Sequence, residues 1–323
     1  MSWTITADLT AFETEAGPFL RERPVENSVP VTVTAALRRR GLDAYGGQPP
    51  LFGWWRPEPG AAVAAAFLRT PPQPPLLTGG PPSAAGELAE VWSGEAPGGV
   101  RGERESAEAF GAAWAARTGA EVTVERATRL YRLGDLTPRR PAPPGRARVA
   151  GPADRELLLR WHRAFTVDIG EPPVDDERAV DDAIALGGRT VWERDGEPVA
   201  MAGRAADAAD PSGTVRVVAV YTPPAHRGHG YAGGATAAVS RAALDAGARD
   251  VVLFADLANP VSNALYRHLG FRPVRDHVSL AFGDGDRDGD GDGDVPGGGG
   301  VESGGDVSGG GALAGGGSGE PGE

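Results

Sequence analysis

The sequence predicts an α+β fold in which helices flank a central β-sheet, and two patterns carry this prediction. First, the dipeptide Asp195-Gly196 separates two apolar strands, which is typical of a two-residue β-hairpin. Second, a further apolar strand leads through a glycine-rich turn into a helix of small residues. The elements predicted in this way are strands at 190–194, 197–202 and 215–221, and a helix from 231 to about 244.

The rest of the segment 146–282 continues the same alternation of strands and helices. Apolar side chains recur at helical spacing in two stretches before the hairpin, and short apolar runs bound by turn residues predict strands at both ends of the segment. These elements are helices at 154–165 and 175–186 and strands at 146–149, 251–255 and 278–282.

Residues 1–135 predict a second, smaller α+β domain. Its strands are expected to include a hairpin formed by 51–55 and 62–68. The remaining elements predicted here are strands at 31–34 and 128–133 and a helix at 106–117.

Two segments are predicted to lie outside the folded domains. Residues 136–145 contain four prolines and therefore predict a linker. Residues 283–323 are rich in glycine and aspartate and poor in apolar side chains, so we expect this tail to be disordered. Asp284 begins a stretch similar to a calcium-binding EF-hand loop, but Val295 occupies the twelfth position, where a glutamate is required. We therefore expect no metal site.

Composition narrows the class of protein. The formal net charge is −12 and much of it comes from the tail, so electrostatics give no reason to expect nucleic acid as a partner. Cysteine is absent, which excludes disulfides and Cys-ligated metals. Neither a signal peptide nor a stretch of about 20 apolar residues is visible. We expect a cytoplasmic protein with no membrane partner. The absence of lysine resembles the codon bias of a GC-rich bacterial genome.

The turn after the 215–221 strand is predicted to bind phosphate. Glycines let a backbone approach a ligand closely, and the free N–H groups of a helix N-terminus attract anions. Gly228, Gly230 and Gly233 also match a Rossmann fingerprint, but the preceding hairpin and the Pro223-Pro224 pair argue against that fold. A Walker loop is excluded because the chain has no lysine. The predicted phosphate-binding residues are Arg227, Gly228, His229, Gly230, Tyr231 and Ala232.

The stretch from Arg227 to Ala232 reads R-x-x-G-x-A and resembles the signature of the GNAT superfamily of N-acetyltransferases. A second stretch, from Asn259 to Phe271, is similar to that family's N-x-x-[SA]-x-x-[LF]-Y-x-x-x-G-F segment. The resemblance covers about residues 146–282 and implies a GNAT-like, mixed and mostly antiparallel sheet. It also suggests that residues 1–135 are a degenerate GNAT-like copy, although an accessory domain is an alternative because no R-x-x-G-x-A occurs there.

The same resemblance implies a set of cofactor-binding residues. In the family, the strand before the phosphate loop separates from its neighbour, and its free backbone groups bind the pantetheine arm and thioester of acetyl-CoA. The matching residues here are Val220, Tyr221 and Thr222. Asn259 matches the residue that hydrogen-bonds the pantetheine.

Tyr266 is the best catalytic candidate, because the resemblance implies that it protonates the departing thiolate. A purely structural role, packing its helix on the sheet, is the alternative. A general base is less clear. Asp256 is a candidate, as are Glu171 and Asp168, but each could be an ordinary surface or capping acid. The histidines have no metal-ligand spacing, so no metal is expected.

These observations predict an acetyl-CoA-dependent N-acetyltransferase that acts on a primary amine of a small molecule or a protein, by direct attack in a ternary complex. The alternative is a non-catalytic acyl-CoA-binding sensor or regulatory module. We expect a monomer or homodimer whose ligands are acetyl-CoA and the amine.

Overall fold

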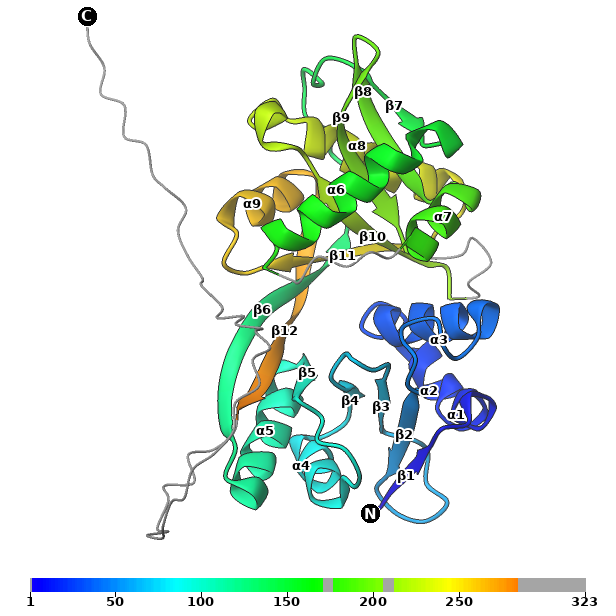
Figure 1. Ribbon diagram of the computed structural model, residues 1–323, viewed down its shortest axis with the longest axis vertical. Coiled ribbons are helices and arrows are strands. Elements are labelled where there is room, and N and C mark those ends of the chain that lie inside the picture. Colours follow the sequence, from blue (N-terminus) through cyan, green and yellow to red (C-terminus); the bar gives the residue numbers. More distant parts are fainter. Residues whose placement is uncertain (1, 171–176, 206–211, 284–323) are drawn as a thin grey trace, which may run out of the picture. The chain divides into compact units, whose positions relative to one another are not determined.

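The structure is a computed structural model and describes residues 2–170, 177–205 and 212–283 (Figure 1). The first half of the described chain contains both strands and helices and ends in a long strand. Its elements are β1 (Ser2–Thr6), α1 (Leu9–Glu15), α2 (Gly17–Glu22), α3 (Ser28–Arg40), β2 (Leu51–Arg56), β3 (Ala65–Arg69), β4 (Leu76–Gly79), α4 (Pro82–Val91), β5 (Gly99–Glu103), α5 (Arg104–Thr118) and β6 (Glu121–Leu133).

The second half has a similar order of elements, with two α-helices instead of three after its first strand. Its elements are β7 (Arg146–Val149), α6 (Arg155–Asp168), α7 (Glu177–Ala185), β8 (Arg189–Arg194), β9 (Glu197–Arg204), β10 (Thr214–Tyr221), α8 (Tyr231–Asp245), β11 (Asp250–Asp256), α9 (Pro260–His268) and β12 (Phe271–Gly283), with short 3₁₀ turns at Pro152–Asp154 and Pro224–His226.

The predicted hairpin is confirmed. Strands β8 and β9 pair antiparallel, with Arg194 opposite Glu197. Asp195 and Gly196 have φ angles of 51° and 84°, as a type I′ turn requires. The other predicted elements of the second half are also present, each within a few residues of its expected boundaries except β12, which begins seven residues before its predicted start at 278. The tail and the segment containing Glu171 lie outside the described residues.

The strand predicted at 31–34 is wrong, because these residues lie inside α3. Valine and threonine favour strands only weakly, and tertiary packing overrides that preference here. The hydroxyl groups of Thr32 and Thr34 donate to the carbonyl oxygens of Ser28 and Pro30, at 2.9 and 3.0 Å, so they are satisfied within the helix. Leu37 is buried on the same helix in a cluster that includes residues of α1, β2 and β3.

The twelve described strands form one mixed, mostly antiparallel sheet in the order β1-β2-β3-β4-β5-β12-β6-β11-β10-β9-β8-β7. Among them, only β4–β5 and β10–β11 pair parallel. The long strands β6 and β12, near the centre of Figure 1, pair with each other over most of their length. In addition, β6 pairs with β11 of the second half, and β12 pairs with β5 of the first half. Each half thus places its last strand beside the fifth strand of the other.

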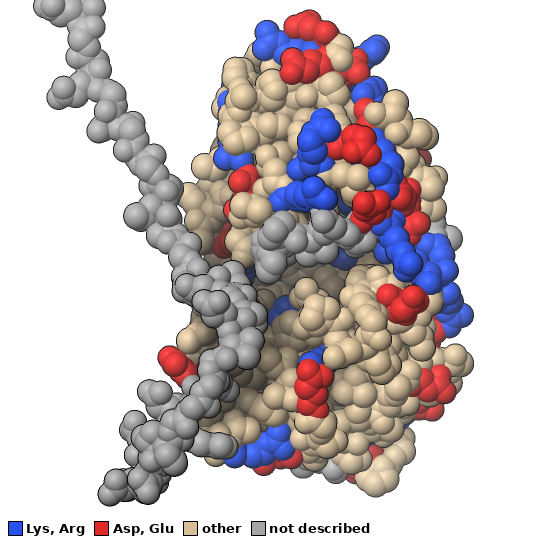
Figure 2. Space-filling model, in the orientation of Figure 1, with Lys and Arg blue, Asp and Glu red and all other residues tan. Residues whose placement is uncertain are grey.

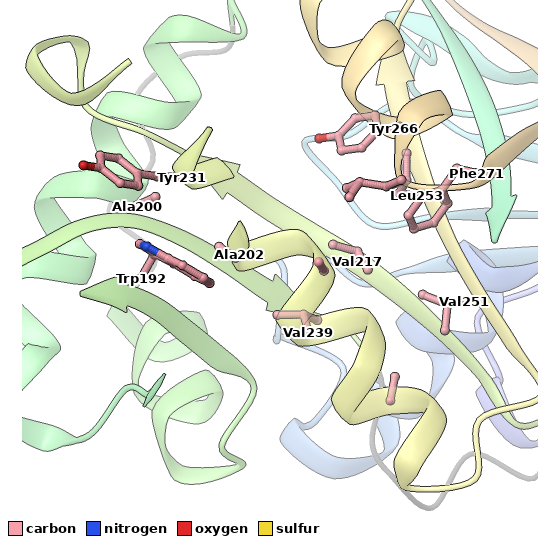
Figure 3. Packing of buried hydrophobic residues seen from close by; sticks show 14 of the residues in the cluster. Trp192, Ala200, Ala202, Val217, Tyr231, Val239, Val251, Leu253, Tyr266 and Phe271 are labelled. Atoms are coloured by element: carbon pink, nitrogen blue, oxygen red, sulfur yellow. The ribbon is translucent and has the colours of Figure 1, made fainter. Parts of the chain in front are cut away.

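Helices cover both faces of the sheet in the second half. Neighbouring residues on one strand point to opposite faces, so Ala200 and Ala202 pack with α8 and α9, whereas Met201 packs with α6 and α7. Figure 3 shows the first of these two clusters, with Trp192 and Tyr231 at one end. These two hydrophobic clusters, one on each face of the sheet, hold in place the strands that carry the candidate site.

Candidate functional site

Strand β10 contains a β-bulge near its end. Ala219 has a φ angle of 50°, which is unusual for a residue other than glycine, and the register with β9 shifts between Val218 and Tyr221. The bulge sends both Ala219 and Tyr221 toward α6, where the Tyr221 ring lies 6.2 Å from that of Trp161.

Strands β10 and β11 pair only at their starts and separate before the bulge. Their parallel pairing covers only Thr214–Arg216 and Asp250–Val252. From Leu253 onward, β11 pairs with β6 along one edge and has no described partner along the other. Val220, Tyr221 and Thr222, which the family resemblance implies as cofactor-binding residues, therefore lie where the sheet opens. Backbone groups at such an opening are available to a ligand.

The glycine-rich loop leads directly into α8. Gly228 and Gly230 both have φ angles of 82°, in the left-handed region that favours glycine. Gly230 is the N-cap of the helix, and no side chain caps the first turn. The N–H groups of Tyr231 and Ala232 consequently lack acceptors within the helix. Partial positive charge at this end of a 15-residue helix suits an anion.

The Arg227 guanidinium is engaged with neighbouring elements. It forms an ion pair with Asp168 at the end of α6, and its Nε donates to the carbonyl oxygen of Thr222 at 3.1 Å. Burial raises the pKa of the Tyr221 hydroxyl, Asp168 raises it further, and Arg227 opposes both effects. Arg227 thus fixes the loop against β10 and α6, and this contact also uses Asp168, one of the candidate bases.

His229 and Tyr231 shape the loop from two sides. Their rings stack with centroids 5.4 Å apart. The Tyr231 ring is buried in the α8 core, and its hydroxyl accepts a hydrogen bond from Nη1 of Arg194 at 3.1 Å. These contacts order the backbone from Arg227 to Ala232.

The segment predicted as a linker lies against this loop. A Cβ atom added to Gly230 would be 3.2 Å from Nη1 of Arg139 and 3.9 Å from Pro143. Trp192 holds the end of the segment by donating from Nε1 to the carbonyl oxygen of Pro144 at 2.9 Å. Arg139 is exposed and has no ion pair among the described residues. Sequence reasoning missed this cation because only the tertiary fold brings it to α8.

Tyr266 lies on α9, on the same face as α8, and only 7% of its surface is exposed. Its ring contacts Phe271 edge to face at 6.1 Å, and Figure 3 shows its hydroxyl pointing away from Phe271. Burial raises the pKa of the hydroxyl to about 12. The hydroxyl has no hydrogen-bond partner among residues 2–170, 177–205 and 212–283.

Asp256 and Asn259 both cap the start of α9. Asp256 accepts a hydrogen bond from the backbone N–H of Ala258 at 2.7 Å, and its other oxygen lies 3.9 Å from Nε of Arg126. Asn259 accepts from the N–H of Ser262 at 3.0 Å. The capping role considered for Asp256 therefore has a direct contact in the structure.

Asn263 is a buried residue of this site that sequence reasoning missed. Its Nδ2 donates to the carbonyl oxygens of Asp256 and Asn259, at 2.6 and 2.7 Å. Its Oδ1 accepts from the Tyr131 hydroxyl at 2.8 Å. Because Tyr131 belongs to β6, a strand of the first half holds the helix that carries Tyr266. The only sequence signal was the place of Asn263 between two motif residues.

Two kinds of feature are absent from the described residues. No group of three His, Asp or Glu side chains there could hold a metal ion. No helix in the same ranges combines the length and apolar character needed to cross a membrane.

The fold is shared with several solved structures. A GNAT-family acetyltransferase from Colwellia psychrerythraea superposes with a TM-score of 0.55 at 11% identity, covering 87% of this chain and 99% of that chain. A GCN5-related N-acetyltransferase from Sphaerobacter thermophilus gives a TM-score of 0.56 at 17% identity, covering 87% and 95%. A Drosophila protein gives 0.58 at 13% identity, covering 86% and 95%. The common fold therefore extends over both halves.

No curated protein sequence matches this chain. A family model does: that of the acetyltransferase (GNAT) family matches residues 156–271, which run from α6 to the start of β12 and include the bulge, the glycine-rich loop and Tyr266. Residues 156–271 of this chain therefore belong to the acetyltransferase (GNAT) family.

Proposed function

We propose that the chain is an acetyl-CoA-dependent N-acetyltransferase that acts on a primary amine by direct attack in a ternary complex. The proposal rests on three features of β10, where the sheet opens, and of the helices α8 and α9 that follow β10 and β11. These are the bulge at Ala219, the uncapped N-terminus of α8 after Gly230, and the buried residue Tyr266, whose hydroxyl has no described partner.

The loop fits the pyrophosphate of the cofactor. Two left-handed glycines expose the N–H groups at the start of α8, and a Cβ at Gly228 would meet no atom within 4 Å, so the backbone there is open to a ligand. Arg139 adds a cation beside Gly230. Acetyl-CoA would supply the activated acetyl group as a thioester. The separated edge of β10 at Val220 and Tyr221 would hold the pantetheine arm and stabilise negative charge on the carbonyl oxygen.

Tyr266 would deliver a proton to the leaving sulfur. A pKa of about 12 keeps the phenol protonated across the neutral range, which suits an acid rather than a base. Asp256 and Asp168 already bind a backbone N–H and Arg227, respectively. We therefore propose that the amine loses its proton to water rather than to a carboxylate of the described residues.

A thiol-release assay tests this function. Purified chain is incubated with acetyl-CoA and a panel of amines, amino acids and aminoglycosides, and free CoA is measured. We expect amine-dependent release above the rate of hydrolysis with at least one class of acceptor. Acetylation of that acceptor, seen by mass spectrometry, would complete the test.

The second candidate is a non-catalytic acyl-CoA sensor, which the engagement of both described candidate bases favours. Calorimetric binding of acetyl-CoA without CoA release across the whole amine panel would support the sensor. Absence of binding would contradict both functions.

A further inference from the structure

A cavity of about 910 Å³ lies between the two halves of the described chain, away from the candidate site. The first half contributes α1, α2 and α3, and the second contributes α7 and the ends of β8, β9 and β10. Its lining includes no residue of the 227–232 loop, of α8 or of α9. The volume is within the range of about 300–1,000 Å³ typical of small-molecule sites.

Seven arginines line this cavity, against two acidic residues, Glu13 and Asp182. Both acids are already paired: Glu13 with Arg38, and Asp182 with Arg40. Figure 2 shows that charged side chains of both signs also gather over the α6 and α7 half of the molecule. The cavity lining therefore carries an excess of positive charge, although the net charge of the whole chain is −12.

Two of these arginines, Arg189 and Arg216, are partly buried and have no carboxylate partner among the described residues. Arg216 donates from Nη2 to the Thr32 hydroxyl at 2.8 Å, while its buried Nε has no partner. The Arg189 side chain has neither a hydrogen bond nor an ion pair with the described residues. Burial lowers the pKa of both guanidinium groups to about 10. Buried cations are normally paired, because removing a charge from water is unfavourable.

We propose that this cavity binds a small organic polyanion, a ligand with two or more carboxylate or phosphate groups. Arg189 and Arg216 supply the planar, multi-donor groups that bind such oxygens most tightly. Val31, Ala35 and Val218 give the cavity an apolar wall for the carbon skeleton. Since Thr32 and Arg216 come from different halves, the ligand bridges the halves of the molecule.

Calorimetric titration of the full chain at low ionic strength tests this site, with citrate and inorganic pyrophosphate as probes. At least one probe is expected to bind with a Kd below about 1 mM. Arg189→Met and Arg216→Met should each weaken binding at least about tenfold. Arg241→Gln removes an exposed charge from α8, outside the cavity, and should leave the Kd unchanged. Citrate binding alone identifies a carboxylate ligand, and pyrophosphate binding alone a phosphate ligand.

Ala35→Trp tests the site independently, because loss of binding in an arginine variant also follows if that variant misfolds. The tryptophan fills the cavity from an exposed position and keeps every charge. It too should abolish probe binding. Failure of both probes to bind the parent chain would overturn the proposal. So would binding that survives Arg189→Met and Ala35→Trp but is lost in Gly230→Asp, since that result would place the anion at α8.

Discussion

A catalytic role and a purely structural role of Tyr266 predict different effects of removing its hydroxyl group. Tyr266→Phe keeps the ring against Phe271 and removes only the hydroxyl, which has no described partner. If the hydroxyl protonates the leaving sulfur, kcat should fall by about 10²–10⁴ while acetyl-CoA affinity changes little. Steady-state kinetics with the amine found by the screen measure this effect. Unchanged turnover would assign Tyr266 to packing alone.

Ala219 holds a backbone conformation that suits glycine better. Its φ angle of 50° is strained for a residue with a Cβ atom, so Ala219→Gly should raise the free energy of unfolding by about 0.5–1 kcal/mol. Ala202→Gly in β9 is the matched control, because Ala202 is buried but has no positive φ, and this change should destabilise. Denaturant titration of both variants shows whether each change raises or lowers the free energy of unfolding. Destabilisation by Ala219→Gly would show that the bulge stores no strain.

At the scale of elements, the start of α6 depends on a buried carboxylate. Asp154 accepts two hydrogen bonds from Arg148, at 2.7 and 2.8 Å, and one from the N–H of Gly151 at 2.8 Å. These contacts hold its pKa below the ordinary value of 3.8. The stability they provide is therefore complete above that pH and is lost as pH falls through the lower, folded-state pKa.

Asp154→Asn should accordingly lower the free energy of unfolding by about 1–3 kcal/mol at pH 7. The difference between variant and parent should shrink as pH falls below 3.8 toward the lower folded-state pKa, where the native carboxyl becomes protonated. Urea titrations across this range measure both quantities. A stability difference between variant and parent that does not change with pH would contradict the stabilising role of the ionised Asp154 carboxylate.

Arg139 is expected to strengthen cofactor binding at the α8 N-terminus. Arg139→Gln removes an exposed cation beside Gly230 and should raise the Kd for acetyl-CoA by about two- to tenfold at low salt. The effect should decrease as salt screens the charge. Arg241→Gln removes a charge near the other end of the same helix and should have no effect. Equal Kd values for Arg139→Gln and the parent would place the phosphates elsewhere.

Elements with a strong local signal could be predicted, and those formed by tertiary contacts could not. Asp195-Gly196 defines its hairpin by chemistry alone. By contrast, Val31 to Thr34 resemble a strand and form a helix, because packing on α1, β2 and β3 decides the outcome. The 220–222 opening was expected from a family resemblance, whereas the positive φ of Ala219 that accompanies it has no sequence signal.

At the scale of the whole molecule, the two halves exchange their last strands. A sequence gives no local sign that β6 will lie between β11 and β12, because such pairing depends on contacts far apart in the chain. The exchange matters for the site, since β6 carries Tyr131 and Tyr131 bonds to Asn263 on α9. The position of Arg139 at the loop is a long-range effect of the same kind.

We propose that the first half is a degenerate copy of the second. Its helix α4 follows β4 as α8 follows β10, but Pro81 is its N-cap and Pro82 its first residue, so the first helical N–H is missing. A Cβ at Gly79 would lie 2.4 Å from the Phe19 ring, so that turn is filled rather than open. This half is therefore suited to support the site rather than to bind a second pyrophosphate.

Calorimetric titration of acetyl-CoA into the full-length chain and its Gly230→Asp variant tests most directly whether the α8 N-terminus binds the cofactor. Aspartate places a negative charge where the pyrophosphate is expected, so affinity should fall at least about 100-fold. Gly230→Asn adds a side chain of the same shape, tolerates a φ of 82° and lacks the charge, so it should lose much less. Unchanged acetyl-CoA affinity in a folded Gly230→Asp variant would contradict the assignment of this loop.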